Sequence, residues 1–238
     1  MNVLITGASR GIGRAIAEKF ASEGFNIIIN YNKSKLEDVE KLKEYLENKY
    51  NIKVLCLKCD VSQEEEVKKL FYDIKKWCEK LDCIVNNAGI ANDMLLDEKT
   101  SSDFLDVLKV NLLGTFLICK YGYKLIDEGS IINISSNNAY GGYIESVDYD
   151  ASKAGVIALT HDFAKYLSPK IRVNCLCPGW IDTDMNKNMF EEFREKEKNK
   201  ILLKKFGEAK DIAEAVYFLA TNQYINNAII KVDGGYEN

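Results

Sequence analysis

The sequence has one histidine, two prolines and no excess of positive charge. Because His161 is alone, a serine–histidine hydrolase or a multi-histidine metal centre would be hard to build. The 32 basic and 36 acidic residues leave a net charge of −4, which argues against nucleic acid as a partner. No run approaches the roughly 18 apolar residues of a transmembrane helix, and no basic segment precedes the apolar start of the chain. We therefore expect neither a membrane span nor a signal peptide.

Seven cysteines, an odd number spread along the chain, fit a reducing compartment better than a disulfide framework. Cys56 and Cys59 have the CxxC spacing, but residues three apart on a strand point to opposite faces. Cys175 and Cys177 would share a face, yet no second pair accompanies them. We interpret all seven cysteines as structural, expect no metal site and place the protein in the cytoplasm.

What the chain does contain is a regular alternation of short apolar runs and amphipathic stretches. Such alternation indicates a parallel sheet covered on both faces, and right-handed crossovers then give a doubly wound Rossmann fold. Expected strands are residues 3–6, 26–30, 52–57, 83–86, 130–135, 172–175 and 228–232, and expected helices are 12–22, 35–49, 64–80, 102–126, 149–167 and 211–220. We predict a single α/β domain over residues 1–238, with a seven-stranded parallel sheet and a small helical insertion on the substrate side at 184–207.

A glycine-rich turn, TGASRGIG at residues 6–13, joins the first expected strand to the first expected helix. Glycines allow a tight turn and the close approach of a pyrophosphate to backbone N–H groups at a helix N-terminus. A turn of this composition alone could be purely structural, but its place between strand and helix favours a phosphate site. The expected contacts in this turn are Gly7, Ser9, Arg10, Gly11, Ile12 and Gly13.

This segment resembles the glycine motif of the short-chain dehydrogenases/reductases, and further motifs follow in the order of that family. Similarity extends from residue 2 to Gly235, and it implies a Rossmann fold and an NAD(P)-dependent oxidoreductase. Residues 86–89 match the family's NNAG motif, and 178–183 match its PG motif after the sixth strand. The resemblance implies cofactor contacts from Asp60, Val61, Asn87, Ala88, Gly89, Pro178, Gly179, Ile181 and Thr183.

The end of the second expected strand bears on the choice of nicotinamide cofactor. A carboxylate there would bind the ribose hydroxyls of NAD and repel a 2′-phosphate, but this strand runs into Asn32 and Lys33. Arg10 and Lys33 together could clamp a phosphate. We therefore expect NADP(H) to be preferred, with NAD(H) as the alternative if Lys33 and Lys35 are only solvated lysines at the start of a helix.

Tyr149 and Lys153 are four residues apart, so they share one face of an expected helix. A cation beside a tyrosine favours the phenolate and lowers its pKa, although the same spacing also occurs by accident in lysine-rich helices. Ser136 stands thirteen residues before Tyr149, as the family's catalytic serine does, and Asn111 matches the asparagine of its catalytic tetrad. Ser135 is interpreted as a strand-end neighbour.

The resemblance implies a role for each of these four residues. Tyr149 would protonate the carbonyl oxygen, and Ser136 would polarise the carbonyl by a hydrogen bond. Lys153 would lower the pKa of the tyrosine and bind the nicotinamide ribose, so Tyr149 and Lys153 also count as cofactor contacts. Asn111 would order a water that links the lysine to solvent.

Among subfamilies, the 3-oxoacyl-[acyl-carrier-protein] reductases are most similar, which implies an acyl thioester substrate and acyl carrier protein as a partner. Two features depart from that pattern: Asp127 and Glu128 stand where the subfamily is basic, and Glu145 and Asp148 are expected to face the substrate. A reductase of free carbonyls, sugars or polyols is the alternative, and a non-catalytic dinucleotide sensor is the third interpretation. Members of the family are usually tetramers, so we expect a homotetramer, with a homodimer as the alternative.

Overall fold

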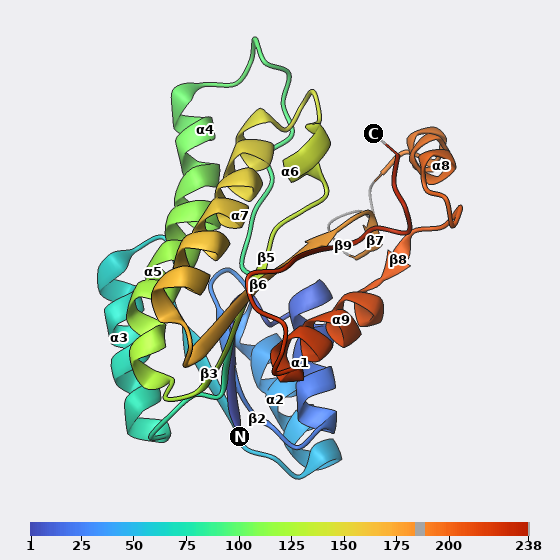
Figure 1. Ribbon diagram of the computed structural model, residues 1–238. Helices are drawn as coiled ribbons and strands as arrows, with labels where there is room; N and C mark the ends of the chain where they lie inside the picture. The colour runs from blue at the N-terminus through green and yellow to red at the C-terminus, as the bar shows by residue number, and fades with distance from the viewer. Residues whose placement is uncertain (184–188, 238) are drawn as a thin grey trace.

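Seven parallel strands form the central sheet of the computed structural model, which describes residues 1–183 and 189–237 (Figure 1). Their order across the sheet is β3-β2-β1-β4-β5-β6-β9, and each neighbouring pair is parallel. The strands are β1 (Asn2–Ile5), β2 (Asn26–Tyr31), β3 (Val54–Lys58), β4 (Cys83–Asn86), β5 (Gly129–Ile134), β6 (Ile171–Pro178) and β9 (Ile229–Val232). The order reverses between β1 and β4, which confirms the doubly wound α/β architecture predicted from the sequence.

Helices cover both faces of the sheet because the strands are apolar on both faces. On β1, Val3 and Ile5 pack with one set of helices and Leu4 with the other, as alternation along a strand requires. One face carries α1 (Gly11–Ser22), α2 (Leu36–Tyr50) and α9 (Ala209–Thr221), to the right in Figure 1. The other face carries α3 (Glu64–Trp77), α5 (Gly114–Gly122) and α7 (Val147–Leu167), to the left.

The helix expected over residues 102–126 is not continuous. It divides into α4 (Ser101–Leu108), a π-helical turn (Lys109–Leu113), α5 and a 3₁₀ turn (Tyr123–Leu125). A π turn widens the helix by one residue and is often found at functional sites. Here the wider turn contains Asn111, whose carbonyl oxygen accepts a hydrogen bond from Thr115 Oγ1 at 2.7 Å. Apolar periodicity alone does not reveal the π turn, because α4, the π turn and α5 follow one another with no non-helical residue between them.

Two short strands on the right of Figure 1 and a one-turn helix after β5 were not expected from the sequence. β7 (Ile181–Asp182) and β8 (Gly207–Glu208) form a two-stranded parallel sheet that brings together the two ends of the expected insertion. The described part of that insertion contains α8 (Glu191–Lys200), whereas residues 184–188 lie outside the described residues. A one-turn helix, α6 (Asn138–Gly141), follows β5.

The structure also bears on the expectations about disulfides, membrane spans and metal sites. Each of the seven cysteines is a free thiol. None of the helices within residues 1–183 and 189–237 is long and apolar enough to cross a membrane. In the same part of the chain, no group of three or more histidine, cysteine or acidic side chains is arranged to hold a metal ion.

Candidate active site

The loops that follow six strands of the sheet meet in one cleft with a volume of about 780 Å³. Parallel strands place their carboxyl ends at one edge, so residues far apart in sequence come together there. Every expected cofactor contact lines this cleft: Gly7, Ser9, Arg10, Gly11, Ile12, Gly13, Asn32, Lys33, Asp60, Val61, Asn87, Ala88, Gly89, Tyr149, Lys153, Pro178, Gly179, Ile181 and Thr183. Ser136 lines it as well, whereas Asn111 is the one expected site residue that the described lining does not include.

The glycine turn after β1 has a shape that only small residues allow. Gly7 and Gly11 have φ angles of 63° and 54°, in the left-handed region that favours glycine. A Cβ atom on Gly13 would lie 2.3 Å from the carbonyl oxygen of Gly7 and 2.6 Å from Asn87 Nδ2. Within the described residues, no side chain caps the start of α1 and its first turn contains no acid. The turn therefore leaves backbone N–H groups free for an anion, and it fits the pyrophosphate of a dinucleotide.

Two residues that sequence reasoning missed hold the glycine turn in place. The Oγ1 atom of Thr6 accepts hydrogen bonds from the backbone N–H groups of Asn87 and Ala88, both at 3.0 Å. Asn87 Nδ2 in turn donates to the carbonyl oxygens of Thr6 and Gly7 at 2.9 and 3.1 Å. Asn30, on β2, accepts from the Gly7 N–H at 3.4 Å. The one available signal was polarity, since Thr6 and Asn30 are polar residues at the ends of apolar strands.

Cationic and neutral polar groups line the cleft where β2 ends. Among the described lining residues, the three that follow the strand are Asn32, Lys33 and Ser34, so none of them is acidic. Ser34 Oγ and Ser9 Oγ are hydrogen-bonded at 2.7 Å, which joins this loop to the glycine turn. Lys33 and Arg10 are both exposed and line the same cleft. This arrangement can accept a phosphate ester near β2 without an opposing carboxylate from that strand.

Tyr149, Lys153 and Ser136 converge where α7 passes the end of β5. Lys153 Nζ donates to the carbonyl oxygen of Ile134 at 2.8 Å and lies 5.5 Å from the centre of the Tyr149 ring. Ser135 Oγ donates to the carbonyl oxygen of Lys153 at 2.8 Å, so Ser135 joins the strand to the helix. Both serines line the cleft, and Ser136 hydrogen-bonds with the Tyr149 phenol. The role of Ser136 at a substrate carbonyl stays a prediction.

Burial controls the protonation of the tyrosine and the lysine. It raises the pKa of Tyr149 to about 12, and the hydrogen bond with Ser136 lowers that pKa only in part. It also lowers the pKa of Lys153, which is 4% exposed, to about 8. The sequence interpretation had expected the lysine to lower the tyrosine pKa. The structure differs because loss of water disfavours both charged forms, the phenolate and the ammonium. Tyr149 therefore keeps its proton at neutral pH and can act as a hydrogen-bond donor.

The buried Lys153 ammonium predicts a pH-dependent stability difference. Below pH 8 the folded protein bears the full cost of burying this charge, about 3 kcal/mol. Between pH 8 and 10.5 only the unfolded chain keeps the proton, so stability rises with pH and the cost disappears. We expect Lys153→Met to lack this rise, so its stability relative to the unsubstituted protein falls by about 3 kcal/mol from pH 7 to 10. Urea unfolding of both proteins at several pH values measures this difference in the free energy of unfolding. A difference that does not change with pH would contradict the claim that Lys153 is buried as a charged group below pH 8.

Asn111 lies behind the cleft wall and is 1% exposed. Its Oδ1 accepts from the Ile90 N–H at 2.9 Å, and its Nδ2 donates to the Ile90 carbonyl oxygen at 2.9 Å and to Ser152 Oγ at 3.0 Å. A Cβ on Gly89 would lie 3.3 Å from Asn111 Oδ1 and 3.5 Å from Lys153 Nζ, so these two side chains flank that glycine. Asn111 thereby fixes the loop after β4 against α7, and its role in ordering a water stays a prediction.

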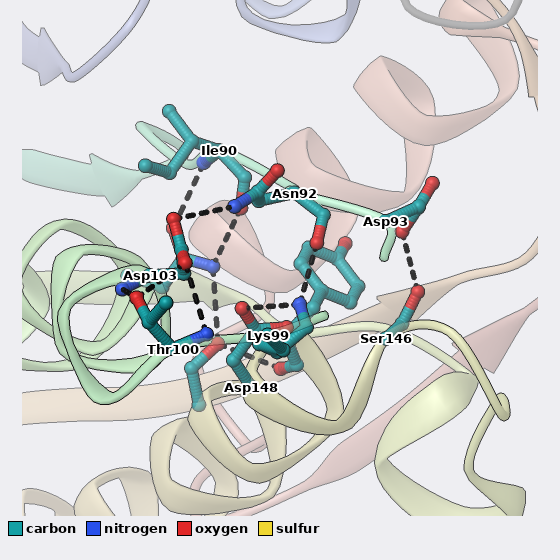
Figure 2. A network of polar contacts seen from close by, with 11 residues as sticks. Ile90, Asn92, Asp93, Lys99, Thr100, Asp103, Ser146 and Asp148 are labelled. Carbon is teal, nitrogen blue, oxygen red and sulfur yellow. Dashed lines mark hydrogen bonds and ion pairs between the residues drawn. The ribbon is translucent and has the colours of Figure 1, made fainter. Parts of the chain in front are cut away.

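The expectation that Asp148 faces the substrate is wrong. Its side chain is fully buried and accepts a hydrogen bond from Lys99 Nζ at 2.7 Å (Figure 2). Glu145 is half-buried. The carboxylate that does line the cleft on this side is Asp93, which accepts from Ser146 Oγ at 2.5 Å. His161 is remote from the chemistry, with its Nδ1 2.6 Å from Asn227 Oδ1.

Aromatic rings form one wall of the cleft. Tyr143 and Trp180 both line it, and Phe193 of α8 makes edge contacts with each, with ring centres 6.2 and 6.0 Å apart. Phe206 stacks on Trp180 at 5.8 Å, and the Trp180 Nε1–H donates to the buried carboxylate of Glu197 at 3.1 Å. The rings make this wall largely apolar, so it suits a ligand with an uncharged body.

The chain is similar to known proteins over nearly its whole length. A family model described as enoyl-(acyl carrier protein) reductase matches residues 7–237. The 3-oxoacyl-[acyl-carrier-protein] reductase of Aquifex aeolicus (strain VF5) is 40% identical, over 98% of this chain and 95% of that protein. Carbonyl reductase family member 4 of Danio rerio is also 40% identical, over 98% and 97%. A solved dehydrogenase/reductase from Sinorhizobium meliloti 1021 is 32% identical, covers 98% of this chain and 94% of that one, and superposes with a TM-score of 0.92.

Proposed function

The chain belongs to the short-chain dehydrogenase/reductase family and is an NAD(P)-dependent oxidoreductase of carbonyl and hydroxyl groups, and from that premise we propose that it reduces 3-oxoacyl thioesters with NADPH. The observation that carries the proposal is the convergence of Ser136, Tyr149 and Lys153 beside the phosphate turn in one cleft. The 40% identity to a reductase named for the acyl carrier protein substrate supports the choice of substrate.

In the proposed reaction, some residues of this chain bind the cofactor and others activate and protonate the substrate carbonyl. When bound, the nicotinamide cofactor supplies the hydride. The glycine turn would hold the pyrophosphate, and Lys153 would donate to the nicotinamide ribose. Ser136 Oγ donates a hydrogen bond to the substrate carbonyl and so stabilises the charge that develops on its oxygen. Tyr149, which burial keeps protonated, transfers its phenolic proton to that oxygen.

The preference for NADPH is proposed from the cations near the end of β2. Lys33 and Arg10 line the cleft there and are exposed, so they can reach a 2′-phosphate. We expect Lys33→Glu to lower kcat/KM with NADPH by about tenfold or more, because a carboxylate would repel the phosphate, and to change kcat/KM with NADH much less.

Lys35→Glu is the matched control for that substitution. It makes the same charge change two residues along, at the exposed N-cap of α2, and Lys35 is outside the described lining of the cleft. Steady-state kinetics with both cofactors give the comparison. Equal effects of the two substitutions, or a strong preference of the unsubstituted protein for NADH, would contradict the proposal.

A second candidate substrate class is free carbonyl compounds. Three observations favour it: the acidic Asp127 and Glu128, Asp93 in the cleft, and the uncharged aromatic wall of Tyr143 and Trp180. The Danio rerio relative is named a carbonyl reductase. Oxidation of NADPH with acetoacetyl thioesters of acyl carrier protein, coenzyme A and N-acetylcysteamine separates the classes. Turnover with the thioesters supports the first class, and turnover only with free ketones or aldehydes supports the second.

We also propose that the protein is a homotetramer. An apolar hollow on α4, the π turn, α5 and α7 supports it, because such a surface favours contact with another subunit. Leu105 and Leu113 border the hollow and are 50% and 40% exposed in a single chain. The hollow is lined by Leu105, Leu108, Lys109, Leu112, Leu113, Phe116, Gly155 and Leu159.

A further inference from the structure

A buried ion pair lies directly beside the proposed catalytic tyrosine. Lys99, in the loop between β4 and α4, and Asp148, in the first turn of α7, have side chains that are 2% and 0% exposed. Their Nζ and Oδ2 atoms are 2.7 Å apart (Figure 2). Other ion pairs in the described structure are more exposed on at least one side, such as Lys41–Glu37 on α2 at 66% and 75%. Burying two charged groups costs free energy unless each group also makes further hydrogen bonds. The other hydrogen bonds of the Lys99 ammonium and the Asp148 carboxylate are therefore part of what stabilises this pair.

Each member of the pair holds a piece of backbone that borders the cleft. Asp148 Oδ1 accepts from the backbone N–H of Tyr149 at 2.9 Å. Lys99 Nζ donates also to the carbonyl oxygen of Asn92 at 2.6 Å. The residues around Asn92 form the cleft wall, since Ile90, Ala91 and Asp93 all line it. The pair therefore connects that wall to the residue from which the proton is proposed to come.

Further contacts join the same two segments. Asp93 accepts from Ser146 Oγ at 2.5 Å, and the Met94 N–H donates to the carbonyl oxygen of Glu145 at 3.0 Å. Figure 2 shows the Asp93–Ser146 contact beside the Lys99–Asp148 pair, whose two side chains are almost fully buried. Hydrogen bonds with ionised partners are stronger than neutral ones, and Lys99–Asp148 has two charged partners, whereas the Asp93 contact has one and the Met94 contact has none. We therefore expect the buried Lys99–Asp148 pair to influence most strongly where α7 begins relative to the loop.

We propose that Lys99 and Asp148 are positioning residues for proton transfer by Tyr149, a role that rests on the proposed function of that tyrosine. They act as one charged connection that sets the first turn of α7, and hence the Tyr149 phenol, against the loop after β4. Displacement of a reacting group by about 1 Å can cost about 100-fold in rate, so a loosened connection lowers kcat while the distant phosphate turn still binds cofactor.

The test compares Lys99→Met, Asp148→Asn and the double variant with the unsubstituted protein. Each single variant leaves one buried charge unpaired, so it loses stability as well as activity. The double variant leaves no unpaired charge, and the amide oxygen introduced by Asp148→Asn can still accept from the Tyr149 N–H. We expect the double variant to regain the melting temperature but to keep kcat about tenfold below that of the unsubstituted protein, with KM for NADPH within about twofold. Lys41→Met with Glu37→Gln, which neutralises the exposed pair on α2, is the matched control and leaves kcat unchanged.

Amide hydrogen exchange gives a readout that does not depend on turnover. We expect the Tyr149 amide and residues 90–99 to exchange about tenfold faster in the double variant, while β1 and the glycine turn are unchanged. Recovery of both kcat and exchange in the double variant would overturn the positioning role, because the pair would then only satisfy its own buried charges. If a single variant does not fold, kcat and hydrogen exchange of the double variant alone decide whether the pair has the positioning role. If the unsubstituted protein reduces no carbonyl, the proposed function fails, and exchange at Tyr149 alone decides whether the pair positions it.

Discussion

Replacing Tyr149 with phenylalanine is expected to lower kcat for carbonyl reduction by about 10³-fold or more while NADPH binds with unchanged affinity. The phenylalanine ring fills the same volume and keeps the packing at the end of β5. Only the hydroxyl is lost, and burial holds the proton on that hydroxyl because it raises the pKa of Tyr149 to about 12. Ser136, the side chain that hydrogen-bonds with Tyr149, is a much weaker acid than a phenol and is not expected to take over this proton transfer.

NADPH oxidation measured by absorbance gives kcat, and quenching of protein fluorescence gives the dissociation constant. The matched control is Tyr72→Phe, which removes the same atom from an exposed tyrosine on α3 and is expected to change neither quantity. Turnover of Tyr149→Phe within about tenfold of the unsubstituted protein would remove Tyr149 from its proposed role.

Gly13→Ala is expected to abolish cofactor binding, with an increase in Kd for NADPH of about 100-fold or more. The new Cβ would lie 2.3 Å from the Gly7 carbonyl oxygen and 2.6 Å from Asn87 Nδ2, closer than real contacts allow. The glycine turn must therefore move away from the loop after β4, and the two hydrogen bonds from Asn87 Nδ2 to that turn are lost. The same overpacking costs about 1–3 kcal/mol of folding stability.

Gly24→Ala separates the loss of binding from the loss of stability. Gly24 follows α1 and has a φ of 81°, so alanine strains its backbone, but the added Cβ meets nothing within 4 Å. We expect this control to lower stability by about 1 kcal/mol and to leave the Kd for NADPH unchanged. If both variants bind NADPH normally, the glycine turn is not the phosphate site.

Much of the fold follows from the sequence because apolar alternation is a local property that each strand and helix carries in itself. The order of strands then follows from right-handed crossovers. The π turn at Lys109–Leu113 was not predicted, because its Asn111 side chain makes its hydrogen bonds with Ile90 and Ser152, which are distant in sequence. The pairing of β7 with β8 was missed for a different reason. Each strand has only two residues, which is too short for an apolar pattern to be recognised in the sequence.

The positions of the candidate site residues were predictable from motifs, but their electrostatics were not. Asp148 was expected to repel an anionic substrate, yet Lys99, 49 residues away in sequence, pairs with it in the interior. Lys153 was expected to lower the pKa of Tyr149, yet burial raises that pKa and lowers the pKa of Lys153 itself. Both differences come from burial, which depends on how all neighbouring elements pack together and leaves no pattern in the sequence.

The most direct test of the proposed function is NADPH oxidation by the purified protein with acetoacetyl-N-acetylcysteamine, a 3-oxoacyl thioester without phosphate, compared with the Tyr149→Phe variant. We predict reduction to the 3-hydroxyacyl thioester by the unsubstituted protein and a rate lower by about 10³-fold in the variant. Binding of NADPH without reduction of this thioester or of any free carbonyl compound would contradict the proposed function.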